Sequence, residues 1–212
     1  MIGVGYATLE AQAELRLAGV FSSHAVLQRG RPLPVWGWGD EGATVKVTFC
    51  GRAVETRVVG GKWRVELPAQ RAGGPYEMEV RSGAESVTLS DVLVGEVWVA
   101  SGQSNMEWPL TRSENPQAAI ASSANPRIRL YTVPKRKAEA PIDDIKAQWQ
   151  LCGPETVGGF SAVAYFFGRD LGKELGVPIG LIHTSWGGSP AEAWTSEPAL
   201  SASEELKKDI LD

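Results

Sequence analysis

The chain has 212 residues, of which 43% are hydrophobic, so it can form one large or two small domains with a buried core and lacks the composition of a disordered protein. Its formal net charge is -4 and its basic cluster is limited to Lys135-Arg136-Lys137, which argues against nucleic acid as a partner, because phosphate binding needs many clustered cations. We interpret this cluster as a solvated loop. No stretch is long and apolar enough to span a bilayer, so no membrane partner is expected.

Residues 1–13 are expected to precede the folded part. They end in Ala11-Gln12-Ala13, an A-x-A pattern typical of a signal-peptidase site. The segment lacks a basic start and carries Glu10 where an apolar core would stand, so we interpret it as the remnant of an export signal.

Residues 14–93 predict an antiparallel β-sandwich. Short runs rich in β-forming residues occur at 33–38, 44–49, 53–59, 62–67, 76–81 and 86–93. Apolar and polar residues alternate over 45–49, as a half-buried sheet requires. Gly60-Gly61 between two runs predicts a two-residue hairpin turn. No catalytic cluster is evident here, which favours a sugar-binding, positioning or structural role for this domain.

Residues 94–212 change to strands that alternate with helices, the pattern of a parallel α/β sheet. We expect a strand over 96–100, a long polar excursion over 111–147 with one short strand at 128–133, and a buried central strand over 179–184. Ser161 as N-cap and Gly176 at the carboxyl end delimit a helix through residue 174. Residues 197–211 predict a last amphipathic helix.

The segment from Glu96 to Glu107 carries the strongest functional signal. A buried strand ends at Gly102 and Ser104 follows it. A serine hydroxyl becomes a nucleophile at neutral pH when it is held at a sheet edge, beside a base and donors for the oxyanion. Met106 stands where the nucleophile elbow G-x-S-x-G has its second glycine, so an ordinary α/β-hydrolase is a poor match. Taken alone, Ser104 has the alternative role of a turn serine that caps the next helix.

The residues of this segment also carry a family resemblance. Gly102-Gln103-Ser104-Asn105-Met106 resembles the first sequence block of the sialate O-acetylesterase family, a branch of the SGNH (GDSL-like) hydrolases that includes carbohydrate acetylesterases. Three further stretches, at 20–29, 160–169 and 179–194, are similar to that family and follow in its order. The resemblance implies that the sandwich at 14–93 is followed by an incomplete SGNH-type α/β/α parallel-sheet domain at 94–212, truncated at its carboxyl terminus.

The same resemblance implies roles for particular residues. Ser104 would attack the ester carbonyl of an O-acetylated sugar, while its own N–H and that of Gly188, with Gly187 as second choice, would donate to the oxyanion. Gln103, Asn105 and His183 would lie on the substrate side. The resemblance implies an acetylated carbohydrate as partner, no metal and no organic cofactor, and a periplasmic or secreted location, since members of the family are commonly exported.

The base of the reaction is missing from the chain. The family has its catalytic Asp and His in an Asp-x-x-His motif, which does not occur here. We interpret His24 as a turn or edge residue and His183 as a packed or substrate-side residue. The chain is therefore expected to be the nucleophile-bearing, amino-terminal portion of a longer esterase, with little activity alone and with an exposed sheet edge and uncovered apolar faces.

Two alternatives remain open from the sequence. A polysaccharide ester such as acetyl xylan would need the same small acetyl pocket. A non-catalytic carbohydrate-binding protein would keep the fold without the base. The eight tryptophans suit sugar stacking in either case, with the alternative that most are core or interface residues, since Trp36, Trp38, Trp63 and Trp98 lie in strand-like runs. The sequence does not determine the oligomeric state.

Overall fold

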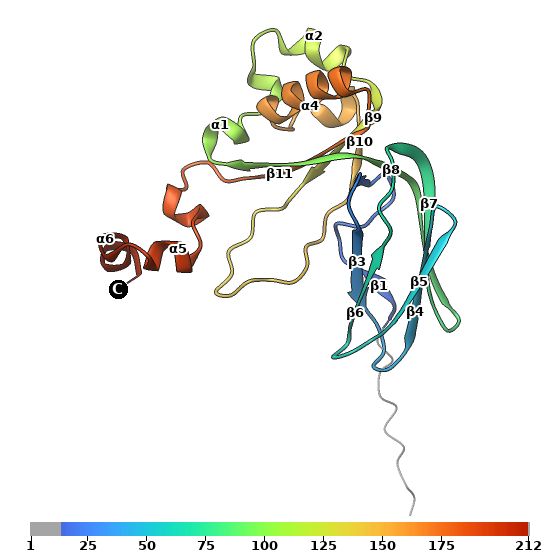
Figure 1. Cartoon of the computed structure of the whole chain (residues 1–212). Helices are drawn as coiled ribbons and strands as arrows, with labels where there is room; N and C mark the ends of the chain where they lie inside the picture. The colour runs from blue at the N-terminus through green and yellow to red at the C-terminus, as the bar shows by residue number, and fades with distance from the viewer. Residues whose placement is uncertain (1–13, 212) are drawn as a thin grey trace, which may run out of the picture.

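The computed structural model describes residues 14–211, so the expected signal-peptide remnant at 1–13 lies outside the described residues. The fold is mixed α/β (Figure 1). In chain order the strands are β1 (Arg16–Leu17), β2 (Val26–Gln28), β3 (Leu33–Trp38), β4 (Thr44–Phe49), β5 (Arg52–Arg57), β6 (Lys62–Leu67), β7 (Gly73–Ser82), β8 (Glu85–Gly102), β9 (Asn125–Thr132), β10 (Gln150–Cys152) and β11 (Ile179–Ser185).

The helices are mostly short. They are α1 (Ser104–Glu107), α2 (Pro116–Ala121), α3 (Pro154–Val157), α4 (Ala162–Leu175), α5 (Glu197–Ser201) and α6 (Glu204–Leu206), with 3-10 turns η1 (Leu110–Arg112) and η2 (Ala191–Trp194) and a π-helical turn η3 (Lys207–Leu211). Within the described part of the chain, none of them is long and apolar enough to cross a membrane.

Strand β8 belongs to both halves of the molecule. Its first part pairs antiparallel with β7, and its last part pairs in parallel with β11, from Ile179 opposite Glu96 to Ser185 opposite Gly102. The larger sheet therefore has the order β10-β9-β11-β8-β7-β4-β5, with β2 also paired to β8, and a smaller sheet has the order β1-β3-β6. The boundary predicted between residues 93 and 94 falls inside β8.

The separate strands expected over 86–93 and 96–100 are one strand, which corrects the prediction. Gly95 lets the backbone of Pro178 approach β8 closely, because a Cβ there would lie 2.0 Å from the backbone oxygen of Pro178. The N–H of Glu96 donates to that same oxygen at 2.9 Å. This close approach holds β8 against the start of β11.

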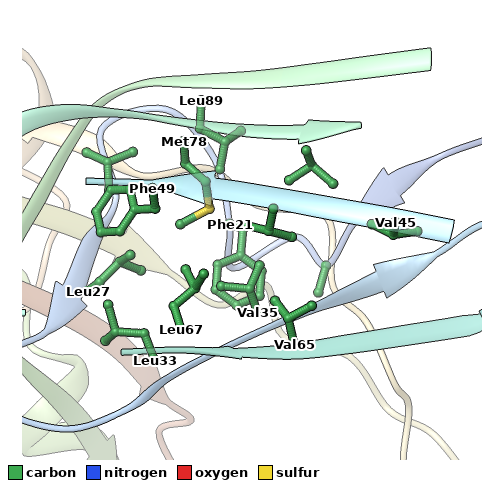
Figure 2. Packing of buried hydrophobic residues seen from close by; sticks show 14 of the residues in the cluster. Phe21, Leu27, Leu33, Val35, Val45, Phe49, Val65, Leu67, Met78 and Leu89 are labelled. Carbon is green, nitrogen blue, oxygen red and sulfur yellow. The ribbon is translucent and has the colours of Figure 1, made fainter. Parts of the chain in front are cut away.

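The core of the amino-terminal half lies between the two sheets (Figure 2). Val35 and Val65 of the smaller sheet share this core with Val45 and Met78 of the larger one, and none of the four is more than 4% exposed. The alternation predicted over 45–49 is confirmed, since every second side chain of β4 is buried.

The turn predicted at Gly60-Gly61 is present. Both glycines have positive φ, 61° and 71°, as a type I′ turn requires. The turn closes a bridge between Val59 and Lys62, beyond which β5 and β6 enter different sheets. It therefore carries the chain from the larger sheet to the smaller one.

Helix α4 packs on the parallel strands and has the predicted ends. Its N-cap Ser161 accepts the N–H of Ala164 at 3.1 Å, and Gly176 ends the helix with a φ of 63°. At Gly168 a Cβ would lie 2.7 Å from Leu181 of β11, so the missing side chain lets the helix approach the sheet closely.

The single last helix predicted over 197–211 is wrong. The segment divides into α5, α6 and η3, because the hydroxyl of Ser203 accepts the N–H of Leu206 at 3.4 Å and starts a new helix. Figure 1 shows these turns lying away from both sheets, near the carboxyl end.

The exposed edge expected for the parallel sheet is present among the described strands. The parallel part of β8 has β11 on one side, and its Trp98 and Val99 are 44% and 63% exposed. The ring of Trp98 contacts Phe167 of α4 at 5.1 Å between centroids, and Phe167 is itself 44% exposed. Strand and helix thus share one uncovered apolar face.

Candidate active site

Ser104 begins helix α1 directly beyond the carboxyl end of β8. Gly102, the last residue of the strand, has a φ of 134°, a conformation that favours glycine, and it turns the chain out of the sheet. Gln103 holds the N-cap position, so Ser104 is the first residue of the helix and not its cap. Its side chain is exposed. The strand, glycine and serine arrangement is as predicted.

The loop after β11 returns beside this serine. Because Ser185 is paired with Gly102 in parallel register, the two strands end at the same level (Figure 1). The N–H of Trp186 donates to the carbonyl of Gly102 at 2.9 Å. A Cβ on Gly187 would lie 3.7 Å from the Cα of Ser104, so Gly187 is packed against the serine.

Gly188 lies one residue further along the loop. Its φ is 80°, and a Cβ built there would meet no heavy atom within 4 Å. Among the described residues its N–H has no hydrogen-bond partner, whereas the N–H of Gly187 donates to the carboxylate of Glu107. The two candidate oxyanion donors thus differ in contacts and in availability.

Glu107 joins three parts of the site. Its carboxylate accepts hydrogen bonds from the ammonium of Lys135 and from the N–H of Gly187. The hydrogen bond from Lys135, followed by the one from Gly187, holds the pKa of Glu107 below its ordinary value. Lys135 also lies 5.7 Å from the ring centroid of Trp186. Lys135 lies in an exposed loop, as predicted for the basic cluster, and it also contacts Glu107 and Trp186.

An open cavity of about 600 Å³ lies over these residues. Its lining includes three charged residues, Glu107, Arg112 and Lys135. The full lining is Ser104, Glu107, Trp108, Pro109, Arg112, Thr132, Val133, Pro134, Lys135, Gly159, His183, Ser185 and Gly187. Of the residues expected on the substrate side, His183 lines the cavity, while Gln103 and Asn105 are exposed and do not.

His183 is buried, at 7% exposure, and its hydrogen bond is made within its own strand. Its Nε2 lies 2.6 Å from the hydroxyl of Ser185, and its ring contacts Phe160 edge to face at 5.3 Å. Its Nδ1 is buried with no hydrogen-bond partner among the described residues. Burial, with a smaller contribution from Lys135, lowers the pKa of His183 against the opposing effect of Glu107. The hydrogen bond of this imidazole therefore goes to Ser185 and not to Ser104.

His24 belongs to a different cluster. It stands in a turn with a φ of 70°, as predicted, and its Nδ1 lies 2.7 Å from Asp91 Oδ2. Asp91 also pairs with the guanidinium of Arg129 at 2.9 Å, and Arg129 is 2% exposed. This cluster ties β9 to the amino-terminal part of β8. Among residues 14–211, no group of His, Cys, Asp or Glu side chains is placed to hold a metal ion.

Sequence reasoning missed Glu107, Arg112 and Lys135 as cavity residues. Glu107 is the last residue of the segment from Glu96 to Glu107 that carries the serine signal. Its partners Lys135 and Gly187, however, are 28 and 80 residues away in the chain. No local pattern reports such a contact, so only the folded chain reveals the cluster.

Comparison with known proteins finds relatives that are named esterases. It is 34% identical over 208 residues to the sialate O-acetylesterase of Rattus norvegicus, covering 88% of this chain and 38% of that protein. It is 34% identical over 218 residues to the sialate O-acetylesterase of Homo sapiens, covering 93% of this chain and 42% of that protein. The resemblance predicted from the four sequence blocks is confirmed, and the chain spans about two fifths of the length of these relatives.

A solved structure supports the same relationship. The crystal structure of a carbohydrate acetylesterase from Xanthomonas citri matches with a TM-score of 0.86 at 39% sequence identity, covering 88% of this chain and 43% of that one. No protein-family model matches the chain.

Proposed function

We propose that this chain bears the nucleophile portion of a serine esterase that removes O-acetyl groups from sugars. The observation that carries the proposal is the placement of Ser104 and the Gly187-Gly188 loop side by side at the ends of two parallel strands, over one cavity. Similarity to sialate O-acetylesterases and to a carbohydrate acetylesterase supports the acetyl ester as the bond that is cleaved.

The chemistry follows the acyl-enzyme route. The hydroxyl of Ser104 adds to the acetyl carbonyl, and the oxyanion is stabilised by the N–H of Ser104 and one N–H of the glycine loop. Collapse of this intermediate forms the acetyl ester of Ser104, and the sugar oxygen leaves with a proton. Water then releases acetate. Gly188 has the free N–H, whereas Gly187 would first exchange its bond to Glu107.

The general base is assigned outside this chain. The Nε2 of His183 is hydrogen-bonded to the hydroxyl of Ser185, and the Nδ1 of His24 is paired with Asp91. Neither side chain is therefore placed to take the proton of Ser104. The proposal assigns the base to an Asp-x-x-His segment that residues 1–212 do not contain. We further propose that the amino-terminal half is the expected β-sandwich, and that β8, β9, β11 and α4 form part of an SGNH-type domain.

A second candidate is a non-catalytic carbohydrate-binding protein. It is favoured by one observation: among the described residues neither histidine is hydrogen-bonded to Ser104, since His183 bonds Ser185 and His24 bonds Asp91. The two candidate functions differ in whether Ser104 becomes a reactive nucleophile when a base is supplied.

The test is a chimera in which this chain replaces the matching part of the Xanthomonas citri esterase. The chimera should release acetate from an acetylated sugar, a serine-directed phosphonate should label Ser104, and both should be lost in Ser104→Ala. The isolated chain serves as the control and should release little acetate, because losing the histidine of a triad removes most of the covalent pathway. A folded chimera that binds sugar but leaves Ser104 unlabelled would support the non-catalytic candidate.

A further inference from the structure

We propose that a second, basic hollow beside the Ser104 cavity binds a carboxylate-bearing sugar unit next to the acetylated one, so that the ligand is an acidic oligosaccharide. This inference rests on the proposed function and narrows its substrate class. It gives a role to the basic cluster that the sequence suggested was only solvated.

The two hollows have lining residues in common. The second has a volume of about 660 Å³ and is lined by Arg16, Pro134, Lys135, Arg136, Asp144, Ile145 and Lys146. It shares Pro134 and Lys135 with the Ser104 cavity, so Lys135 lines both hollows. A ligand that extends from the nucleophile past Lys135 enters the second hollow.

The second hollow has an excess of positive charge. Arg16 is paired with Asp144 at 2.6 Å, and Lys135 is paired with Glu107. Within the described residues, Arg136 and Lys146 have no carboxylate partner. Two cations are therefore available to an anionic ligand, and each gains a charge-assisted hydrogen bond on binding a carboxylate.

The surroundings are suited to holding a sugar acid in place. Asp144 is fixed by the N–H groups of Gly19 and Ile145, at 2.7 Å and 2.9 Å, so the paired Arg16 is held at one side of the hollow. The guanidinium of Arg16 also stacks on Trp38, 3.7 Å from the ring centroid. The hollow therefore has one anchored cation and two cations without a carboxylate partner among the described residues, and Pro134 and Ile145 add apolar side chains to its lining.

The experiment measures binding of trigalacturonate to the whole chain by isothermal titration calorimetry at low salt. Xylotriose is the neutral ligand of equal length. Arg136→Gln with Lys146→Gln should weaken trigalacturonate binding by about tenfold, the effect of two exposed charge contacts of roughly 0.7 kcal/mol each. The matched control, Arg52→Gln with Arg57→Gln, removes two exposed cations from β5 and should change the affinity less than about twofold.

The outcomes separate this inference from the proposed function. The subsite is supported if the double variant of Arg136 and Lys146 binds trigalacturonate more weakly than the wild type, while the control double variant and Ser104→Ala bind it like the wild type. Equal losses in both pairs, equal affinity for xylotriose, or equal affinity for a short single-stranded DNA would overturn it. Failure of the phosphonate to label Ser104 in the chimera refutes the esterase and leaves the calorimetric result unaffected.

Discussion

The backbone N–H of Gly187 donates a hydrogen bond to the carboxylate of Glu107, three residues after Ser104 in the same short helix. This contact fastens the loop after β11 to the helix that begins with the nucleophile. The ammonium of Lys135 is paired with the same carboxylate. The glycine loop is therefore held by a charged group that is itself part of the cavity wall.

Glu107→Gln should loosen this loop. The amide loses the charge that pairs with Lys135 and is a weaker acceptor for the N–H of Gly187. We expect faster hydrogen exchange at the Gly187 amide, measured by NMR at neutral pH. Glu155→Gln on α3 is the control and should leave that amide unchanged. An unchanged exchange rate in Glu107→Gln would show that the loop is held by other contacts.

The two loop glycines should respond differently to a methyl group. A Cβ on Gly187 would lie 2.8 Å from Glu107 Oε2 and 3.7 Å from the Cα of Ser104, whereas Gly188 faces open space. Gly187→Ala should therefore reduce acetate release by the chimera more than Gly188→Ala. The second variant should cost about 1 kcal/mol of stability because φ at Gly188 is 80°. If the two variants lost equal turnover at matched thermal stability, the closer packing of Gly187 against Glu107 and Ser104 would not affect catalysis, and the prediction would be wrong.

Asp91→Asn should destabilise the fold. It leaves the guanidinium of Arg129, which is 2% exposed, without its carboxylate. Removing one partner of a buried ion pair costs at least about 3 kcal/mol of the free energy of unfolding. We expect a cost near this lower limit, because the Asp91 side chain is 31% exposed. Urea unfolding measures the loss. Asp143→Asn breaks the exposed pair with Lys62 and serves as the control, with an expected cost below about 1 kcal/mol.

Stability should fall in mild acid because of His183. Burial lowers its pKa in the folded chain below the ordinary 6.5, so at lower pH the unfolded chain binds a proton that the folded chain does not. The free energy of unfolding therefore decreases as pH falls from 6.5 toward the lowered pKa. His183→Gln removes this titration, and its Tm should fall less than that of the wild type between about pH 7.5 and about pH 5. Parallel Tm profiles would exclude His183 as the source.

Several elements were predictable because the information is local. The bounds of β3, β4 and β6 match the runs predicted at 33–38, 44–49 and 62–67, since side-chain alternation shows within a few residues. Ser161 and Gly176 end α4 through bonds and backbone angles of neighbouring residues. Local signals also misled, because Ser203 divides the last helix by a contact three residues away that hydrophobic periodicity does not report.

The sequence by itself determined the strand that ends at Gly102, the exposed Ser104 beyond it and the glycine loop that follows a second strand. These depend on backbone conformation and hydrophobic periodicity, which neighbouring residues encode. Only the tertiary structure decided that Gly187 packs against Ser104, that Glu107 accepts a hydrogen bond from the N–H of Gly187, and that Lys135 lines two hollows. Those contacts depend on the parallel register of β8 and β11, which brings distant segments to one sheet edge.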